Sequence, residues 1–295
     1  MNKLLTFLVL GTILISCNDG DIIITTFDFE STDLQFCSGN DTYLFFKINE
    51  GKTETLSLYF ENTETLFITS DTLTIALNGS SSYVNYRIFD EEVTASYFCN
   101  EVPPTTPKVI EESFGNSGTA IITSVAIYDD ADGISEEKES SLDTDGDGLL
   151  DYFDFDDDGD NVPTFLELDT ENLDGDNDPF TNPKDSDFDG IADYLDEDDD
   201  GDGVLTRYED VNQNLDPTDD ISDIAVGPNY LNPNISKSIV NDAFREHPFN
   251  FTTSINVKIE DLVLTNSNEQ VIYESLFLGG ISELVSGTLV ITPSF

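Results

Sequence analysis

Residues 143–167 read DTDGDGLLDYFDFDDDGDNVPTFLE, and residues 185–209 repeat this pattern, 42 positions later, as DSDFDGIADYLDEDDDGDGVLTRYE. In both copies aspartates occupy alternate positions, a turn residue follows the third aspartate, and a further acid closes the stretch. Alternate oxygen ligands on a tightly turning chain are typical of a loop that surrounds a hard divalent cation. The two copies therefore predict a segment that folds around metal ions.

Each copy contains two loops of twelve positions: loop 1 (143–154), loop 2 (156–167), loop 3 (185–196) and loop 4 (198–209). In such a loop, positions 1, 3 and 5 supply side-chain oxygens, position 7 a carbonyl, and positions 9 and 12 acids or water-bridged groups. Position 6 needs a positive φ, which suits Gly148, Gly190 and Gly203, and which Asn161 tolerates in loop 2.

The predicted ligands follow from this numbering. In the first copy they are Asp143, Asp145, Asp147, Leu149 (carbonyl), Asp151, Asp154, Asp156, Asp158, Asp160, Val162 (carbonyl) and Glu167. In the second copy they are Asp185, Asp187, Asp189, Ile191 (carbonyl), Asp193, Asp196, Asp198, Asp200, Asp202, Val204 (carbonyl) and Glu209. Thr164 and Thr206 stand at position 9 of loops 2 and 4.

The expected ion is Ca²⁺, because calcium takes six to eight hard oxygens, whereas magnesium is smaller and retains its waters. Weaker copies of the pattern lie at 128–139, 174–185, 210–216 and 221–232. The alternative is a solvated acidic linker. Random acidity would not place acids at positions 1, 3, 5 and 12 in both copies, so we favour metal binding.

A single residue separates loop 1 from loop 2 and loop 3 from loop 4, which leaves no room for the helices of EF-hands. Back-to-back loops with DxDxDGxxDxxD spacing, as in DTDGDGLLDYFD and DSDFDGIADYLD, resemble thrombospondin type 3 repeats. The resemblance covers roughly a third of the chain, residues 129–223. It implies a segment with little regular structure that is rigid only when loaded with calcium. The disulfides of the animal members are missing, because no cysteine follows Asn100.

The formal charge is −50 at pH 7. More than half of the acids lie in residues 129–223, and the only basic residues in this stretch are Lys138, Lys184 and Arg207. Such a charge excludes a nucleic-acid binder. Without counterions the acidic segment should repel itself and expand.

The N-terminus, MNKLLTFLVLGTILISC, has the layout of a secretory signal peptide over residues 1–16. Residues 14–17 (LISC) resemble a bacterial lipobox, which implies that Cys17 is lipidated and that residues 17–20 form a tether. The acids after Cys17 indicate the outer membrane, with exposure at the cell surface. An ordinary signal peptide or an uncleaved anchor are the alternatives.

Two cysteines then remain, Cys37 and Cys99, and in an oxidising compartment we expect them to form a disulfide. Two buried free thiols are the alternative. A catalytic thiol and a zinc site are both disfavoured, because His247 is the only histidine and its position next to Pro248 indicates the end of a helix.

Residues 21–128 alternate apolar and polar side chains, which predicts a mainly β fold with an antiparallel β-sandwich. The expected strands are 43–48, 56–60, 65–69, 73–77, 83–89 and 119–127. Residues 224–295 predict a small C-terminal β region with one short helix, since Ile235, Ile239, Val240 and Phe244 share a helical face. Whether these strands form their own domain or complete the first one is left open by the pattern.

These features predict a calcium-binding, lipid-anchored cell-surface protein that acts as a rigid spacer or as an adhesion and docking module. Its partner would be a protein or a glycan. A carbohydrate-binding lipoprotein is the main alternative, and an enzyme with its site in a β region is another. The sequence contains no GxSxG, HExxH or glycine-rich phosphate loop, so we do not expect an enzyme.

Overall fold

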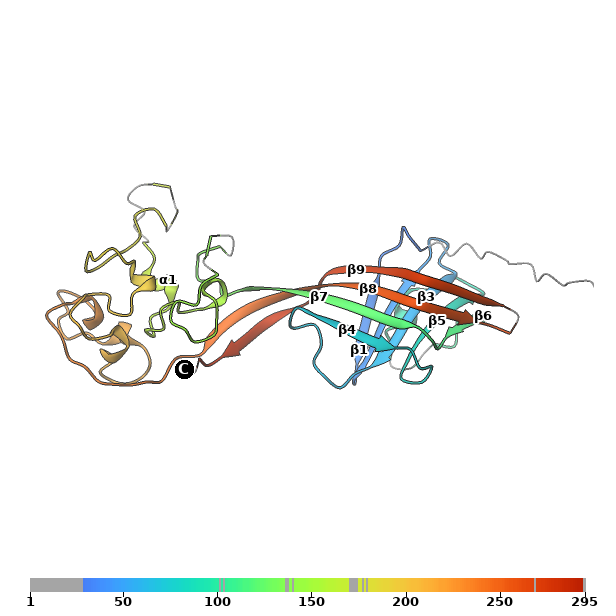
Figure 1. Cartoon of the computed structure of the whole chain (residues 1–295), viewed down its shortest axis with the longest axis horizontal. Helices are drawn as coiled ribbons and strands as arrows, with labels where there is room; N and C mark the ends of the chain where they lie inside the picture. Colours follow the sequence, from blue (N-terminus) through green and yellow to red (C-terminus); the bar gives the residue numbers. More distant parts are fainter. Residues whose placement is uncertain are drawn as a thin grey trace, which may run out of the picture.

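The computed structural model describes residues 29–293 except 101, 103, 136–137, 140, 170–174, 177, 179 and 268. The predicted signal peptide, Cys17 and the tether lie outside the described residues. The described chain is elongated, with packed strands at one end of the long axis and the acidic loops at the other (Figure 1). Within this part of the chain, no helix has the length and hydrophobicity needed to span a membrane.

Nine antiparallel strands make up the regular structure, and the mainly β prediction is confirmed. The strands are β1 (Gln35–Gly39), β2 (Thr42–Ile48), β3 (Glu54–Glu61), β4 (Asp71–Ala76), β5 (Ser82–Phe89), β6 (Val109–Gly115), β7 (Thr119–Asp129), β8 (His247–Thr265) and β9 (Gln270–Ile291). The helical elements are α1 (Thr164–Glu167) and the 3₁₀ turns η1 (Ala95–Tyr97), η2 (Asp151–Phe153), η3 (Asp193–Leu195), η4 (Thr206–Tyr208), η5 (Pro217–Asp219) and η6 (Asn229–Leu231).

The strands form a sandwich with one hydrophobic core. One layer contains β1, β2, β3, β5 and β6, and the other contains β4, β7, β8 and β9 (Figure 1). The layers are joined where β6 pairs briefly with β8, at Gly115 opposite Leu264. A Cβ atom at Gly115 would lie within 3.2 Å of side-chain atoms of Leu262, Leu264 and Val84, so glycine allows the two layers to approach closely at this corner. Apolar side chains of both layers fill the core, among them Phe45, Phe60, Ile122, Val257 and Ile259.

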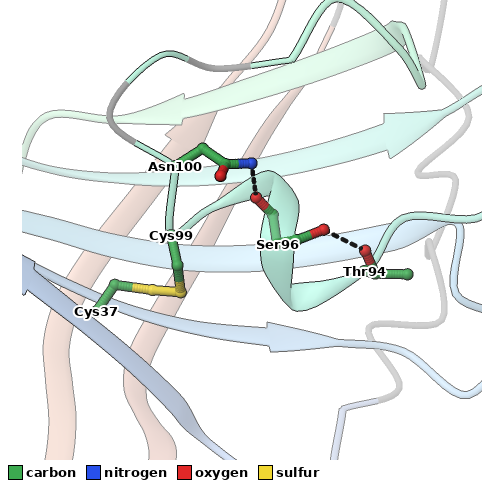
Figure 2. The surroundings of a disulfide bond; sticks show 5 residues. All are labelled: Cys37, Thr94, Ser96, Cys99 and Asn100. Carbon is green, nitrogen blue, oxygen red and sulfur yellow. Dashed lines mark hydrogen bonds between the residues drawn. A yellow bond between two sulfur atoms is a disulfide. The ribbon is translucent and has the colours of Figure 1, made fainter.

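The predicted disulfide between Cys37 and Cys99 is confirmed (Figure 2). It joins β1 to the loop that follows η1, with the two Cα atoms 5.5 Å apart. Around it, Asn100 Nδ2 donates to the Ser96 carbonyl, and the hydroxyls of Thr94 and Ser96 are hydrogen-bonded (Figure 2). The disulfide joins two residues that are 62 positions apart in the sequence, both of which precede the acidic loops.

Strands β7, β8 and β9 extend beyond the sandwich as a ribbon that reaches the acidic loops (Figure 1). Buried and less buried residues alternate along β8, as expected for a strand with one face on the core. Because β8 pairs with β7 and β9 pairs with β8, the C-terminal strands complete the first sheet instead of forming a separate domain. The question that the sequence left open is thereby answered.

Two local predictions are wrong. Residues 65–69 do not form a strand, and residues 233–246 contain no helix. In place of helical hydrogen bonds, this returning segment bonds to the acidic loops: Ile239 N donates to the Tyr208 carbonyl (2.6 Å), and Arg245 N donates to Asn161 Oδ1 (3.0 Å). The apolar spacing of 235–244 therefore reflects an extended chain that crosses the loops.

Candidate metal centre

The four predicted loops share one hydrogen-bond pattern. The position-6 N–H donates to the position-1 carboxylate, the position-5 N–H to position 3, and the position-7 N–H to position 5. The first of these bonds joins Gly148 to Asp143 (3.2 Å), Asn161 to Asp156 (2.9 Å), Gly190 to Asp185 (3.1 Å) and Gly203 to Asp198 (2.9 Å). Each aspartate thus directs one oxygen to the backbone and keeps the other for a different partner.

The backbone also follows the predicted turn. Position 6 has a positive φ in every loop: Gly148 +98°, Asn161 +73°, Gly190 +100° and Gly203 +89°. A further hydrogen bond closes each loop, from the position-9 N–H to the carbonyl before position 1, as from Asp151 to Leu142 (3.0 Å) and from Thr206 to Glu197 (2.8 Å). This closure brings position 9 of each loop next to the start of the same loop.

The second oxygens of these carboxylates are buried without a hydrogen-bond donor among the described residues. They are Asp143 Oδ1, Asp145 Oδ2 and Asp147 Oδ2 in loop 1, Asp156 Oδ1, Asp158 Oδ2, Asp160 Oδ2 and Glu167 Oε1 in loop 2, and Asp198 Oδ1, Asp200 Oδ2, Asp202 Oδ2 and Glu209 Oε1 in loop 4. An unpaired buried carboxylate oxygen is costly unless a cation is its partner. The donor set is all oxygen, which fits calcium. Loop 3 is more exposed, so water can reach its carboxylates.

Loop 2 holds the densest cluster. Asp158, Asp160 and Glu167, with Asp199 from loop 4, each offer an oxygen within 4.8 Å of the others, and none is more than 2% exposed. Two oxygens on opposite sides of one calcium ion lie about 5 Å apart, so this spacing fits a single ion. Burial raises the pKa of the Asp158, Asp160 and Glu167 carboxyls well above their usual values, and the neighbouring carboxylates raise it further. Burial likewise raises the pKa of Asp199 to about 8.

The two loops within each copy pack directly against each other. A Cβ atom at Gly159, position 4 of loop 2, would overlap Asp145 Oδ2 of loop 1. The equivalent glycine of the second copy, Gly201, stands in the same relation to Asp187 Oδ2. Both glycines also have a positive φ (+70° and +65°). The repetition of these glycines therefore has a packing reason as well as a conformational one.

Two predicted ligands are engaged elsewhere. Asp151 accepts hydrogen bonds from Thr144 N (3.0 Å) and Thr144 Oγ1 (2.9 Å), one on each carboxylate oxygen. Asp193 does the same with Ser186 N and Oγ (both 2.7 Å), and it forms an ion pair with Lys184 Nζ (2.5 Å). In this structure each of these position-9 acids is hydrogen-bonded to the residue at position 2 of its own loop.

His247 lies at this centre rather than at a helix end. It is the first residue of β8 and is fully buried, with Nδ1 2.6 Å from Asp154 Oδ1 and Nε2 3.9 Å from Asp156 Oδ2. Burial lowers the pKa of His247, but the carboxylates of Asp154, Asp156 and Asp147 together raise it by more, so the net shift is upward. The histidine therefore attaches the ribbon to the point where loop 1 meets loop 2. No local signal in the sequence indicates this contact.

An aromatic cluster supports the same junction. Phe153 of η2 lies 5.5 Å from Tyr128 of β7 and 5.4 Å from Phe249 of β8, measured between ring centroids. Tyr128 and Phe249 are also 5.5 Å apart and edge to face. Such pairs stabilise packing beyond their buried area. The loops are thus connected to the ribbon by apolar contacts as well as by polar ones.

Asn161 explains why loop 2 departs from glycine at position 6. Its Nδ2 donates to the Ala243 carbonyl (3.1 Å), its Oδ1 accepts from Arg245 N (3.0 Å), and its own carbonyl accepts from Arg245 Nη1 (2.9 Å). A glycine would provide the turn without these side-chain bonds. The asparagine therefore fastens the returning segment to loop 2.

The weaker copies keep parts of the same geometry. At 128–139, Asp132 N donates to Asp130 Oδ1 (3.0 Å) and Ile134 N to Asp132 Oδ1 (2.7 Å), as at positions 3 to 7 of a complete loop. At 210–216, Leu215 N donates to Asp210 Oδ2 (2.8 Å). At 221–232, Asn229 N closes the loop onto the Asp220 carbonyl (2.8 Å), although only Asp223 remains as an acid.

Comparison with known proteins adds no relative: no family model, no curated protein and no solved structure matches the chain. The resemblance to thrombospondin type 3 repeats therefore stays a prediction from the spacing of the loops.

Proposed function

We propose that residues 129–223 bind several Ca²⁺ ions, and that the protein is a lipid-anchored cell-surface module which acts as a spacer or as an adhesion and docking platform. The observation that carries the proposal is the set of buried carboxylate oxygens, each without a donor among the described residues, that recurs in loops 1, 2 and 4. Bound calcium would supply the positive charge that these loops lack. The proposed role is structural and involves no catalytic step.

The acidic segment has little else to hold it together. Among its described residues the buried apolar side chains are few, namely Ile134, Leu149, Val162, Ala192 and Tyr194, and buried carboxylates outnumber them. If free calcium is about tenfold above Kd, each site adds about 1.4 kcal/mol, and four sites add about 6 kcal/mol. This equals the whole stability of many domains, about 5–15 kcal/mol. Metal binding is thus sufficient to decide whether the segment is folded.

The shape of the molecule supports a spacer that faces outward. Phe29, the first described residue, belongs to the sandwich core, while the acidic loops lie at the opposite end of the long axis (Figure 1). The 22 residues of β9 would by themselves span about 70 Å. A lipid on Cys17 would therefore place the sandwich nearer the outer membrane and hold the acidic loops away from its anionic surface. The loops would then be accessible to a protein or glycan partner.

The test is a calorimetric titration of Ca²⁺ into the chelated mature protein, followed in parallel by circular dichroism. We expect uptake of at least about four ions per chain, a change in dichroism that saturates with uptake, and much weaker binding of Mg²⁺. The absence of calcium uptake, or equal uptake of magnesium, would contradict the proposal.

A further inference from the structure

Two buried aspartates occupy a loop position that supplies no ligand in the twelve-position calcium loop. Asp157 and Asp199 occupy position 2 of loops 2 and 4, between the alternate ligand positions. They are 2% and 1% exposed. Their backbone N–H groups donate to equivalent threonine hydroxyls, Thr164 Oγ1 (3.1 Å) and Thr206 Oγ1 (3.3 Å). The two residues therefore occupy the same structural position in the two copies.

The surroundings of Asp199 point to a cation held by a different loop. Neither of its carboxylate oxygens has a hydrogen-bond donor among the described residues. One of them lies within 4.8 Å of oxygens from Asp158, Asp160 and Glu167, the ligand positions of loop 2. Loop 4 thus contributes a carboxylate to the interior of loop 2.

Asp157 is the equivalent residue of the first copy. Its Oδ1 has no donor among the described residues. The incomplete loop 128–139, next to the end of β7, offers oxygens of Asp130, Asp132 and Glu139 within 4.8 Å of one another. Asp130 and Asp132 are 6% and 1% exposed, and the Oδ2 atom of each lacks a donor in the described part of the chain.

Apolar contacts bring the second copy to the incomplete loop, because Tyr194 and Ala192 pack with Ile134.

We infer that Asp199 is a calcium ligand that acts between loops: it completes the site of loop 2 together with Asp158, Asp160 and Glu167. The inference rests on the proposed calcium binding and extends it. The shared ion would then connect the first copy directly to the second copy.

The experiment compares Asp199→Asn with the wild type in the full mature chain. Asparagine has nearly the same shape, and neither carboxylate oxygen of Asp199 accepts a hydrogen bond from the described residues, so the change removes mainly the charged ligand. Glu197→Gln is the matched control, because Glu197 is exposed and carries the same charge next to loop 4. Folding of every variant is verified by the thermal unfolding of the sandwich in the same samples.

Calcium uptake is measured by calorimetry. Asp199→Asn is expected to lose one bound ion per chain or to bind it at least about tenfold more weakly, since even partners of a ligand change affinity by about 10–100-fold. Glu197→Gln should titrate like the wild type. An Asp199→Asn variant that also titrates like the wild type would overturn the inference and leave the proposed function standing. A wild type that takes up no calcium would reject the proposed function itself.

Discussion

The two ends of this molecule bury opposite kinds of side chain. The sandwich excludes water from Phe45, Phe60 and Ile259, whereas loop 2 excludes it from Asp158 and Asp160. Burying apolar groups stabilises a fold without a ligand, but burying like charges destabilises it unless a counterion is present. If the loops bind calcium as proposed, one chain contains two folding conditions: the sandwich folds in water alone, and the acidic end folds only when a cation is also present.

The largest expected effect comes from the apolar end. Phe45 is fully buried and packs against three other rings. The distances between ring centroids are 4.8 Å to Phe36, 6.2 Å to Phe60 and 6.2 Å to Phe67. Phe45→Ala should lower the free energy of unfolding of the sandwich by about 3–5 kcal/mol. Denaturant unfolding in calcium and in EDTA should give the same loss. The control is Phe277→Ala, because Phe277 is 64% exposed. A loss that depends strongly on calcium would break the comparison.

The second prediction concerns pH in the absence of calcium. Burial raises the pKa of Asp199 and of Glu209 to about 8 in each case, above the values of an unfolded chain. The folded segment therefore binds more protons than the unfolded one between pH 4 and pH 8, so its stability falls as pH rises through this range. In EDTA, acidification from pH 8 to pH 5 should make the acidic segment more compact. Because several carboxyls titrate together, this change in hydrodynamic radius should exceed the change that any single loop substitution causes.

With calcium present the sign should reverse, because protons and calcium compete for the same oxygens. Hydrodynamic radius measured at pH 8 and pH 5, with and without calcium, checks both halves of this prediction. An EDTA-treated protein that expands on acidification would contradict it.

The third prediction isolates the packing of loop 1 against loop 2. Gly146 and Gly159 both stand at position 4 with a positive φ (+81° and +70°), but only a Cβ at Gly159 would meet another loop. Gly146→Ala should cost about 1 kcal/mol from backbone strain alone. Gly159→Ala should cost roughly 2 kcal/mol more, through overpacking against Asp145. Thermal unfolding of the calcium-loaded segment measures the difference, and equal losses would show that the loops do not pack closely.

The smallest expected effect concerns Asn161. Asn161→Gly preserves the positive φ of position 6 but removes the side-chain bonds to Ala243 and Arg245. We expect a loss of about 1 kcal/mol in the loaded segment and no change in the number of calcium ions bound. Hydrogen exchange of residues 239–246 should increase, with Asn241→Gly as a control in the same segment. Unchanged exchange would mean that Asn161 does not fasten this segment.

The parts of the centre that depend on neighbours in sequence could be predicted. The positive φ of Gly148, Asn161, Gly190 and Gly203 follows from position 6 of a twelve-position loop. The strands 43–48, 56–60 and 83–89 and the pairing of Cys37 with Cys99 followed from alternation and from cysteine count.

The parts that depend on tertiary contacts could not be predicted. Asp199 reaches loop 2 across some thirty residues, and His247 reaches Asp154 only because β8 returns to the loops. The apolar spacing of Ile235 and Ile239 matched a helix, but their backbone groups bond to the loops instead. The length of the C-terminal strands also could not be predicted: β9 continues over 22 residues, with Gly279 at a positive φ of +133° where its register shifts.

The central claim is that the carboxylate-filled end folds only around calcium, whereas the sandwich does not need it. Hydrogen exchange of the full mature protein, measured residue by residue in calcium and in EDTA, tests this most directly. The account predicts that amides of loops 1 to 4 lose their protection in EDTA while those of β2, β3 and β5 keep it. Loops that remain equally protected after chelation would contradict the account.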